Sequence, residues 1–430
     1  MRDRRLDTWE PEDEAFWEQR GRRIAWRNLL VSVFTLFLGF VVWTLWSLVV
    51  VYLPAAGFEY SESELFLLTA LPSLAGATGR LAYSFVVPVF GGRRWNTFAT
   101  ATLVIPTLGL GFAVQNPETP FWLMAFFAVT ARFGGANFSS SMDHISYFFP
   151  EREEGIALGI NGGVSNVGVS AAQFLVPVVI FVDAFGRITG PAQTYLGGSA
   201  GARAMWLQNA GFVWVPFVLV GVVASYLWMN DLPDVDADIS EQLSILRRKH
   251  NWLLCYLYLG TFGSFIGYAV AFPLLTSIQF PARDVSLFAF VGPLLGASIR
   301  PLGGWLSDRL GGARVTLWVF GVMIAGTALV IYTMVIGQFW GFFAAFLLLF
   351  LTSGIGNGST FKMVPVIFRK RHLARVDESD AEERERALSR AKMEAGSVSG
   401  SAAESVPTAG FSSRRRSASP SGWPGRRPPR

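Results

Sequence analysis

The chain of 430 residues is 51% hydrophobic and only 16% charged, with a formal net charge of +5. Soluble proteins carry about 25% charged residues, and no soluble stretch gathers the basic residues into the folded domain that a nucleic-acid-binding protein needs. The single cysteine, Cys255, excludes an intrachain disulfide and a multi-cysteine metal site, and no metal or cofactor is expected.

A charged segment at 1–26 opens the chain, and ten apolar stretches follow it. They lie at 27–53, 64–90, 97–115, 120–148, 156–182, 205–229, 252–276, 284–306, 314–336 and 339–368. Each is long enough to cross a bilayer core. Each is expected to be a helix, because a helix satisfies its own backbone hydrogen bonds in lipid. The sequence therefore predicts an all-α polytopic membrane protein.

Polar segments divide these spans into two groups. The segment 231–250 follows the sixth span and is expected to be a cytoplasmic linker. It would join an N-terminal six-helix bundle at 27–230 to a C-terminal bundle at 251–368 that has four helices and is incomplete. The tail at 369–430 is polar and is expected to be disordered.

Basic residues between the spans predict the orientation. The connections after spans 1, 3 and 9 have no Lys or Arg, whereas those after spans 2, 4, 6 and 8 contain Arg93, Arg94, Arg152, Arg247, Arg248, Lys249, Arg309 and Arg314. Cytoplasmic loops carry the excess of positive charge. The N-terminus is therefore expected in the cytoplasm, and the protein in the plasma membrane.

A repeat relates the two groups of spans. Arg80 precedes the glycine pair at 91–92 in the first group, and Arg300 precedes the pair at 311–312 in the second at the same spacing. The spacing from Arg80 to Asn137 likewise equals that from Arg300 to Asn357. One constant offset thus maps the arginine, the glycines and the asparagine of one half onto the other. Two parallel halves are the pattern of major facilitator transporters.

A charged loop agrees with that pattern. The stretch "GGWLSDRLGGAR" at 303–314 resembles the loop motif of the major facilitator superfamily, with Gly304, Asp308 and Arg309 in it. The first-half copy "YSFVVPVFGGRR" keeps the glycines and arginines but lacks the aspartate. A tight charged turn between helices explains such a motif, so it indicates the fold and not the substrate.

The two repeated arginines are predicted to lie near the middle of the membrane. A helix that runs from Arg80 to the glycine pair rises about 16 Å, which is half of a bilayer core of about 30 Å. An arginine at that depth costs about 2.5–3.5 kcal/mol on insertion scales. Arg80 and Arg300 therefore need compensating negative charge.

A buried carboxylate is one candidate for that charge. Apart from residues at the span ends, the acidic residue that falls inside a predicted span is Asp143. A single carboxylate is poorly placed to neutralise two arginines. The sharper hypothesis is that the missing anion is the substrate, because the arginine fork offers paired donors to a planar oxyanion. A dicarboxylate or a phosphate fits the charges equally well.

Two further polar residues need an account. Arg132 breaks the repeat, since it corresponds to Thr352 in the second half, and it could pair with Asp143 or reach a helix end. His144 lies beside Asp143 near the predicted cytoplasmic end of the fourth span. A proton relay is conceivable there, although a satisfied or solvated histidine is the commoner arrangement.

Glycines crowd the stretch from 132 to 173. Those at Gly159, Gly162, Gly163 and Gly168 fit close packing of membrane helices through small residues. Asn137, Asn161 and Asn166 place polar amides among them, and small neighbours leave room for a ligand against the backbone.

Four segments, in order, resemble the signatures of the nitrate/nitrite porter family of the major facilitator superfamily. They are "GGANFSSSMDHISYFFP", "GIALGINGGVSNVGVS", "YLGTFGSFIGY" and "GIGNGSTFKMVPVIF". The start "DTWEPEDEAFW" resembles that family too, and the resemblance covers about residues 6 to 396. It implies a twelve-helix fold, of which this chain has ten spans.

The resemblance also implies a binding site for nitrate and nitrite. The anion would lie between Arg80 and Arg300, beside Asn166 and Tyr258, with its plane between the rings of Phe138 and Phe361. Gly354, Gly356 and Asn357 would form the glycine-rich segment of the second half. Packing explains most of 37 phenylalanines, and a membrane tyrosine often bonds between helices, so these residue types alone do not indicate a ligand.

The expected mechanism is alternating access around a midplane site. Two arginines without an anion repel each other and resist closure, which favours exchange of nitrate for nitrite. The protein is expected to be a monomer. Proton-coupled nitrate uptake is the alternative, and transport of another small oxyanion is a further one. An enzyme is not expected, because three scattered histidines and one cysteine form no catalytic group. A sensor would need a signalling domain.

The tail departs from the family. After the loop that ends near residue 400 the chain reads "SAAESVPTAGFSSRRRSASPSGWPGRRPPR", which has no Leu or Ile and cannot span a membrane. The pattern indicates a change of reading frame in a full-length porter gene, which would leave the second bundle two helices short and could leave it inactive. A basic tail that binds anionic lipid is the alternative.

Overall fold

The computed structural model describes residues 5–83, 90–135, 137–183, 185, 190–195, 203–232, 249–280, 283 and 288–374. The predicted tail beyond 374 and most of the predicted linker lie outside these ranges. Within them the chain is almost entirely helical, as predicted. One short antiparallel sheet, β1 (Gln193–Tyr195) with β2 (Arg203–Met205), interrupts the helices.

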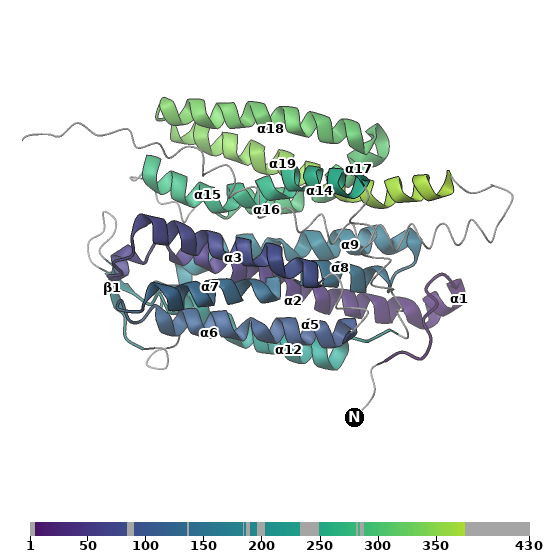
Figure 1. Ribbon diagram of the computed structural model, residues 1–430, viewed down its shortest axis with the longest axis horizontal. Helices are drawn as coiled ribbons and strands as arrows, with labels where there is room; N and C mark the ends of the chain where they lie inside the picture. The colour runs from purple at the N-terminus through teal and green to yellow at the C-terminus, as the bar shows by residue number, and fades with distance from the viewer. Residues whose placement is uncertain are drawn as a thin grey trace, which may run out of the picture.

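The first half of the chain contains the segments that Figure 1 colours purple to teal. They are α1 (Glu14–Phe16), a π-helical turn (Trp17–Gly21), α2 (Arg22–Val49), a 3-10 turn (Pro54–Ala56), α3 (Glu62–Tyr83), α5 (Gly92–Thr102), α6 (Val104–Ala113), α7 (Phe121–Gly135), α8 (Phe138–Ser146), α9 (Glu151–Ser165), α10 (Val167–Val179), α11 (Asn209–Phe212) and α12 (Val215–Trp228).

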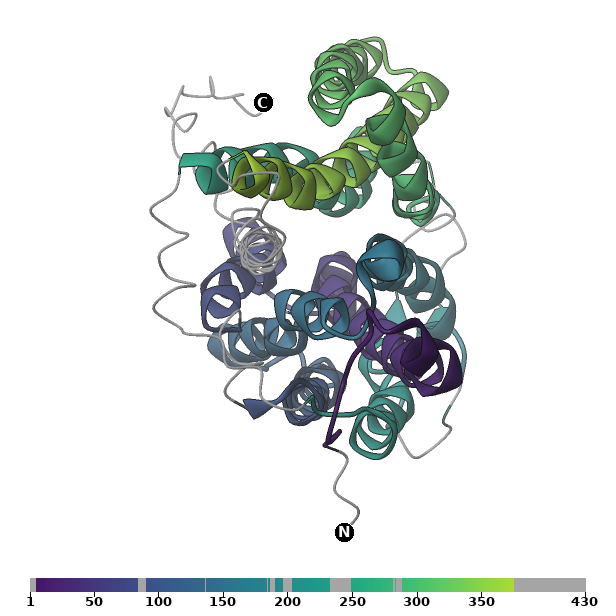
Figure 2. The same cartoon turned by 90° about the vertical axis from the view of Figure 1, so that its right-hand side faces the viewer.

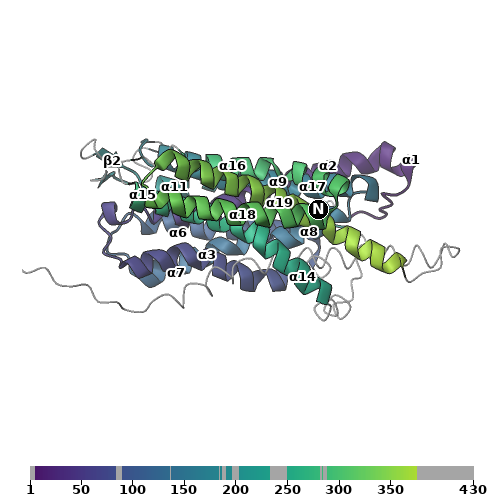
Figure 3. The same ribbon diagram turned by 90° about the horizontal axis from the view of Figure 1, so that it is seen from above.

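The second half packs on one side of the first (Figure 1), and in the view from above its helices lie in front of those of the first half (Figure 3). Its elements are α14 (Lys249–Tyr258), a π-helical segment (Leu259–Gly263), α15 (Ser264–Gln279), α16 (Val291–Ser298), α17 (Arg300–Leu310), α18 (Gly312–Val335) and α19 (Phe339–Leu373). Viewed end-on, the helices fall into two groups that follow the two halves of the sequence (Figure 2). Two bundles are what the repeat predicts.

Seven helical segments in the described part of the chain are long and apolar enough to cross a membrane. They are Glu14–Val49, Gly92–Ala113, Arg152–Val179, Asn209–Trp228, Trp252–Pro273, Gly312–Val335 and Phe339–Leu373, and the shorter Phe121–Arg132 is also apolar. The chain is thus a multi-pass membrane protein. The count of ten spans stays a prediction.

The repeat is visible in the backbone. Gly91 precedes α5 with φ +80° and ψ 144°, and Gly311 precedes α18 with φ +87° and ψ 126°. Both glycines therefore have a left-handed φ that other residues adopt at a cost. Their separation in the chain equals that between Arg80 and Arg300, so one offset relates both the turns and the arginines.

Asp231 supplies a carboxylate to the first-half loop that lacks its own. Its Oδ1 accepts the backbone N–H of Arg93 at 2.9 Å, and its Oδ2 accepts Nε of the same residue at 3.1 Å. An acid near the first turn of α5 is also favoured by the helix dipole. In the second half, Asp308 lies 3.4 Å from Nζ of Lys362, and Arg309 stacks 4.2 Å from the ring of Trp305.

The N-terminal segment covers the end of the first bundle that is cytoplasmic in the predicted orientation. Leu6 donates its N–H to the carbonyl of Asp231 at 3.0 Å. Nε1 of Trp9 bonds the carbonyl of Tyr147, and Nε1 of Trp17 bonds Oε1 of Glu153. This segment is therefore an ordered part of the first bundle.

Candidate functional site

Arg300 is buried at a break between two helices. α16 ends at Ser298, and α17 begins at Arg300 with a proline, Pro301, as its second residue. Proline has no N–H and clashes with the carbonyl four residues earlier, so a helix readily restarts there. The restart places the Arg300 side chain between the bundles, where only 7% of the residue is exposed.

Two aromatic faces hold the guanidinium of Arg300. Its central carbon lies 5.3 Å from the ring centroid of Phe262 and 4.9 Å from that of Phe265. Both distances are within the range of cation–π attraction, about 6 Å. Phe262 belongs to the π-helical segment between α14 and α15, a type of segment that often occurs at functional sites.

Most of the hydrogen-bonding capacity of this guanidinium is unused. Nη1 donates to the carbonyl of Gly162 over a long 3.4 Å. Nε and Nη2 are buried and have no hydrogen-bond partner among the described residues. Because a buried charged donor without an acceptor is costly, this arrangement is suited to accept an anion.

Asn166 adjoins the same carbonyl. Its Nδ2 donates to the Gly162 oxygen at 2.5 Å, and its Oδ1 has no partner in the described part of the chain. The residue is fully buried where α9 gives way to α10. A carboxamide and a guanidinium therefore meet at one backbone oxygen, and their role in binding an anion stays a prediction.

Two rings face each other across the bundle interface. Phe138, the first residue of α8, lies 6.4 Å from Phe262 with the planes at 21°. Tyr258 lies 5.3 Å from Phe262 on the side of the second half. A planar ion between two parallel rings needs about 7 Å, twice the van der Waals spacing of about 3.5 Å. The rings must part slightly to admit one.

Phe262 is a candidate site residue that the sequence analysis missed. It stands four residues after Tyr258, the spacing that puts two side chains on one helical face. That spacing inside the quoted signature was the available signal. The resemblance placed Phe361 opposite Phe138. Phe361 is partly buried on α19, where it packs against the apolar cluster that contains Phe138 and Phe262.

The twin arginine is only partly described. The backbone of Arg80 belongs to α3, and its side chain lies outside the described residues. The repeated asparagines are both buried: Asn137 donates to Oδ1 of Asn96 at 2.6 Å, while Nδ2 of Asn357 has no partner among the described residues.

The glycines of the site divide into two kinds. A Cβ on Gly168 would collide with the Phe37 carbonyl, on Gly354 with the Gly296 carbonyl, and on Gly356 it would come within 2.7 Å of Thr261. These three allow close helix packing. A Cβ on Gly159 or Gly163 would meet no described atom within 4 Å, and one on Gly162 would make ordinary contact with Phe138 at 3.5 Å. The sequence predicts close packing for Gly159, Gly162, Gly163 and Gly168.

Arg132 and His144 contact rings other than those around Arg300. The guanidinium of Arg132 is buried 4.2 Å from the ring of Trp43. His144 is buried against Phe148 with ring centroids 4.9 Å apart, and its Nε2 has no partner among the described residues. No cluster of three or more potential metal ligands occurs in the described part of the chain.

Two helical bundles around a buried guanidinium define a helical membrane transport protein. The family profile described as Major Facilitator Superfamily matches residues 35–376. Over 374 residues the chain is 49% identical to nitrate/nitrite transporter NarU of Escherichia coli, in a match that covers 86% of this chain and 80% of that protein. It is 43% identical over 373 residues to the probable nitrate/nitrite antiporter NarK2 of Thermus thermophilus, covering 85% and 83%.

A solved structure shares the fold. The bacterial homolog of the human lysosomal transporter Spinster, in an inward-facing and unoccupied conformation, gives a TM-score of 0.58 at 16% identity and covers 89% of this chain and 81% of that one. The chain belongs to the Major Facilitator Superfamily and, within it, to the family of these nitrate/nitrite transporters. The predicted fold and family are confirmed. The similarity to transporters also supports the expectation that this chain is not an enzyme.

Proposed function

We propose that this protein exchanges nitrate for nitrite across the plasma membrane by alternating access, as a monomer with a cytoplasmic N-terminus. The observation that carries the proposal is the buried Arg300 guanidinium, whose Nε and Nη2 have no partner among the described residues. A planar oxyanion offers acceptors to both nitrogens at once. The relatives named as nitrate/nitrite transporters supply the identity of the anion.

In the proposed site Arg300 and Arg80 hold the anion from opposite bundles. Asn166 and Tyr258 orient it, and Phe138 and Phe262 cover its two faces. Phe361 belongs to the neighbouring wall. The glycines that pack closely, Gly168, Gly354 and Gly356, let the helices around the site move against one another without side chains between them.

Exchange follows from the charges of this site. Two arginines facing each other without an anion repel, so the empty carrier resists the closure that a return step requires. A bound anion of either kind removes that barrier. Nitrate inward and nitrite outward therefore share one site in turn.

Uptake into proteoliposomes tests the proposal. We expect labelled nitrate to enter vesicles loaded with nitrite much faster than empty vesicles, and Arg300→Lys to abolish the difference. Equal uptake into nitrite-free vesicles driven by a pH gradient would instead establish proton-coupled uptake. Uptake of labelled sulfate or phosphate in place of nitrate would instead establish transport of another oxyanion.

A further inference from the structure

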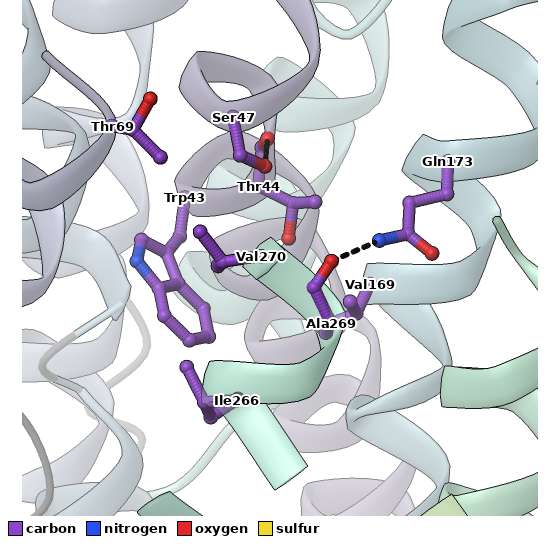
Figure 4. Close-up of a pocket in the computed structure, with 9 residues that line it drawn as sticks. All are labelled: Trp43, Thr44, Ser47, Thr69, Val169, Gln173, Ile266, Ala269 and Val270. Carbon is purple, nitrogen blue, oxygen red and sulfur yellow. Dashed lines mark hydrogen bonds between the residues drawn. The ribbon is translucent and has the colours of Figure 1, made fainter. Parts of the chain in front are cut away.

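A small cavity lies between the bundles on the predicted outer side of Arg300. It is lined by Trp43, Thr44 and Ser47 of α2, Thr69 of α3, Val169 and Gln173 of α10, and Ile266, Ala269 and Val270 of α15 (Figure 4). The rise along a helix from Gly162 to Gln173 is about 16 Å. Helices of both halves meet here, and the lining begins beside the proposed anion site, since Ile266 directly follows Phe265.

A hydrogen bond crosses the interface between the halves at this cavity. Nε2 of Gln173 in the first half donates to the carbonyl of Ala269 in the second half at 3.0 Å (Figure 4). Gln173 is 1% exposed and Ala269 is 3% exposed. The bond is therefore shielded from water, where a lost partner is costly.

A proline makes the Ala269 carbonyl available. In an α-helix a carbonyl accepts the N–H four residues later. For Ala269 that residue is Pro273, inside α15, which has no N–H to donate. The second half thus presents a carbonyl without its usual helical donor, and Gln173 of the other half satisfies it.

The first half has the same arrangement. Gln173 itself stands four residues before Pro177, inside α10. Its own carbonyl likewise lacks the usual helical donor, and its Oε1 has no partner in the described part of the chain. α10 and α15 each have a proline four residues after the residue that makes the contact, Gln173 or Ala269. The bond between the halves thus joins the two positions at which the helical hydrogen bonding is incomplete.

We propose that Gln173 is a latch of the outer gate, which closes on the carbonyl that Pro273 leaves free. The inference rests on the alternating access of the proposed function. To open outward the halves must separate at this level, and the bond between Gln173 and Ala269 must break. Water that enters the gap then solvates both groups. The hydrogen bond therefore stabilises the closed state while the interface excludes water, and contributes little once water has entered.

Two variants weaken the latch from opposite sides. Gln173→Leu deletes the donor. Pro273→Ala gives the Ala269 carbonyl a competing N–H within its own helix, which weakens its bond to Gln173. Because a neutral hydrogen bond contributes a modest net free energy, we expect each variant to raise the outward-open population about three- to tenfold. The double variant should show little further increase, since both changes remove one interaction.

Distance measurement between spin labels reports this population. Labels at Val51→Cys, after α2, and Ile336→Cys, after α18, would mark the outer ends of the two halves in a Cys255→Ser background, with the protein in lipid vesicles without nitrate. Both positions are exposed. The expected result is growth of the longer distance in both single variants.

Pro177→Ala is the matched control. It restores a helical N–H to the Gln173 carbonyl and leaves the side-chain bond to Ala269 in place, so the distances should match those of the unmodified chain. The latch is refuted if Gln173→Leu leaves the distances unchanged, or if Pro177→Ala shifts them as much as Pro273→Ala. A chain that switches normally in these measurements but moves no nitrate would count against the transport proposal alone.

Discussion

Nη1 of Arg300 donates a hydrogen bond to the carbonyl of Gly162, and this bond joins the two halves of the molecule. At 3.4 Å it is long, and the same oxygen already accepts Nδ2 of Asn166. A charged donor that shares a crowded acceptor is readily drawn to a better one. An arriving anion would therefore rearrange a contact between the bundles as it binds.

Arg300→Lys should weaken nitrate binding at least tenfold. Lysine carries the charge as a compact ammonium and lacks the planar fork that pairs with an oxyanion and stacks on Phe262 and Phe265. Calorimetric titration of the purified protein with nitrate measures the loss. Arg309→Lys is the control, since that guanidinium stacks on Trp305 in the loop motif, and its nitrate affinity should stay within twofold.

Phe262→Leu should weaken nitrate binding by about three- to tenfold. The change removes one of the two faces under the guanidinium and the ring opposite Phe138, which together are worth about 1 kcal/mol or more. Phe272→Leu removes a ring that packs among Phe342, Phe343 and Phe346. Equal losses of affinity in the two variants would show that Phe262 acts through packing alone.

Local patterns in the sequence predict the helices and the repeat but not the contacts between distant segments. Apolar runs indicate the spans, and the constant offset of the repeat correctly pairs Gly91 with Gly311. The spacing of four residues puts Phe262 on the same helical face as Tyr258, but its contact with Arg300 depends on how distant segments pack after folding, and no local pattern shows it. Asp231 at the first-half loop is equally non-local, since it lies far along the chain from Arg93.

Gly168→Ala should lower the thermal stability, whereas Gly159→Ala should leave it unchanged or raise it slightly. An added Cβ at Gly168 collides with the backbone of α2, and overpacking of this kind costs about 1–3 kcal/mol. At Gly159 no described atom is within 4 Å, and alanine is the better helix former. Unfolding in detergent, followed by tryptophan fluorescence, compares the two variants.

Gly91→Ala should destabilise the protein more than Gly311→Ala. Both changes force a side chain into a left-handed conformation, at a cost of about 1–2 kcal/mol. At Gly91 the new Cβ would also lie 2.5 Å from Oδ1 of Asp231, while at Gly311 it would meet no described atom within 4 Å. If the two melting temperatures fall equally, the carboxylate of Asp231 has room to move aside.

The raised pKa of Tyr60 should make the protein less stable to unfolding at alkaline pH. Its hydroxyl donates to the Thr119 carbonyl at 2.5 Å, and burial, followed by the charge of Glu64, raises its pKa to about 12. The folded state therefore holds this proton more tightly than the unfolded state. The resulting stabilisation is complete below about pH 10 and disappears as the pH rises towards 12.

Tyr60→Phe should remove that part of the pH dependence. The variant should melt at a lower temperature near pH 8, because the Thr119 carbonyl loses its donor. Its melting temperature should then fall less than that of the unmodified chain between pH 9 and 11. Parallel curves over this range would assign the alkaline loss to other groups.

The hydrogen bond from Leu6 to Asp231 constrains the order in which the first half can assemble during its synthesis. A ribosome releases Leu6 long before it releases the carbonyl that this N–H needs, since nearly the whole first half lies between the two residues. This hydrogen bond can therefore form only after α12, which ends just before Asp231, has been made. The docking of the segment around Leu6 thus depends on a residue that is synthesised after nearly all of the first half.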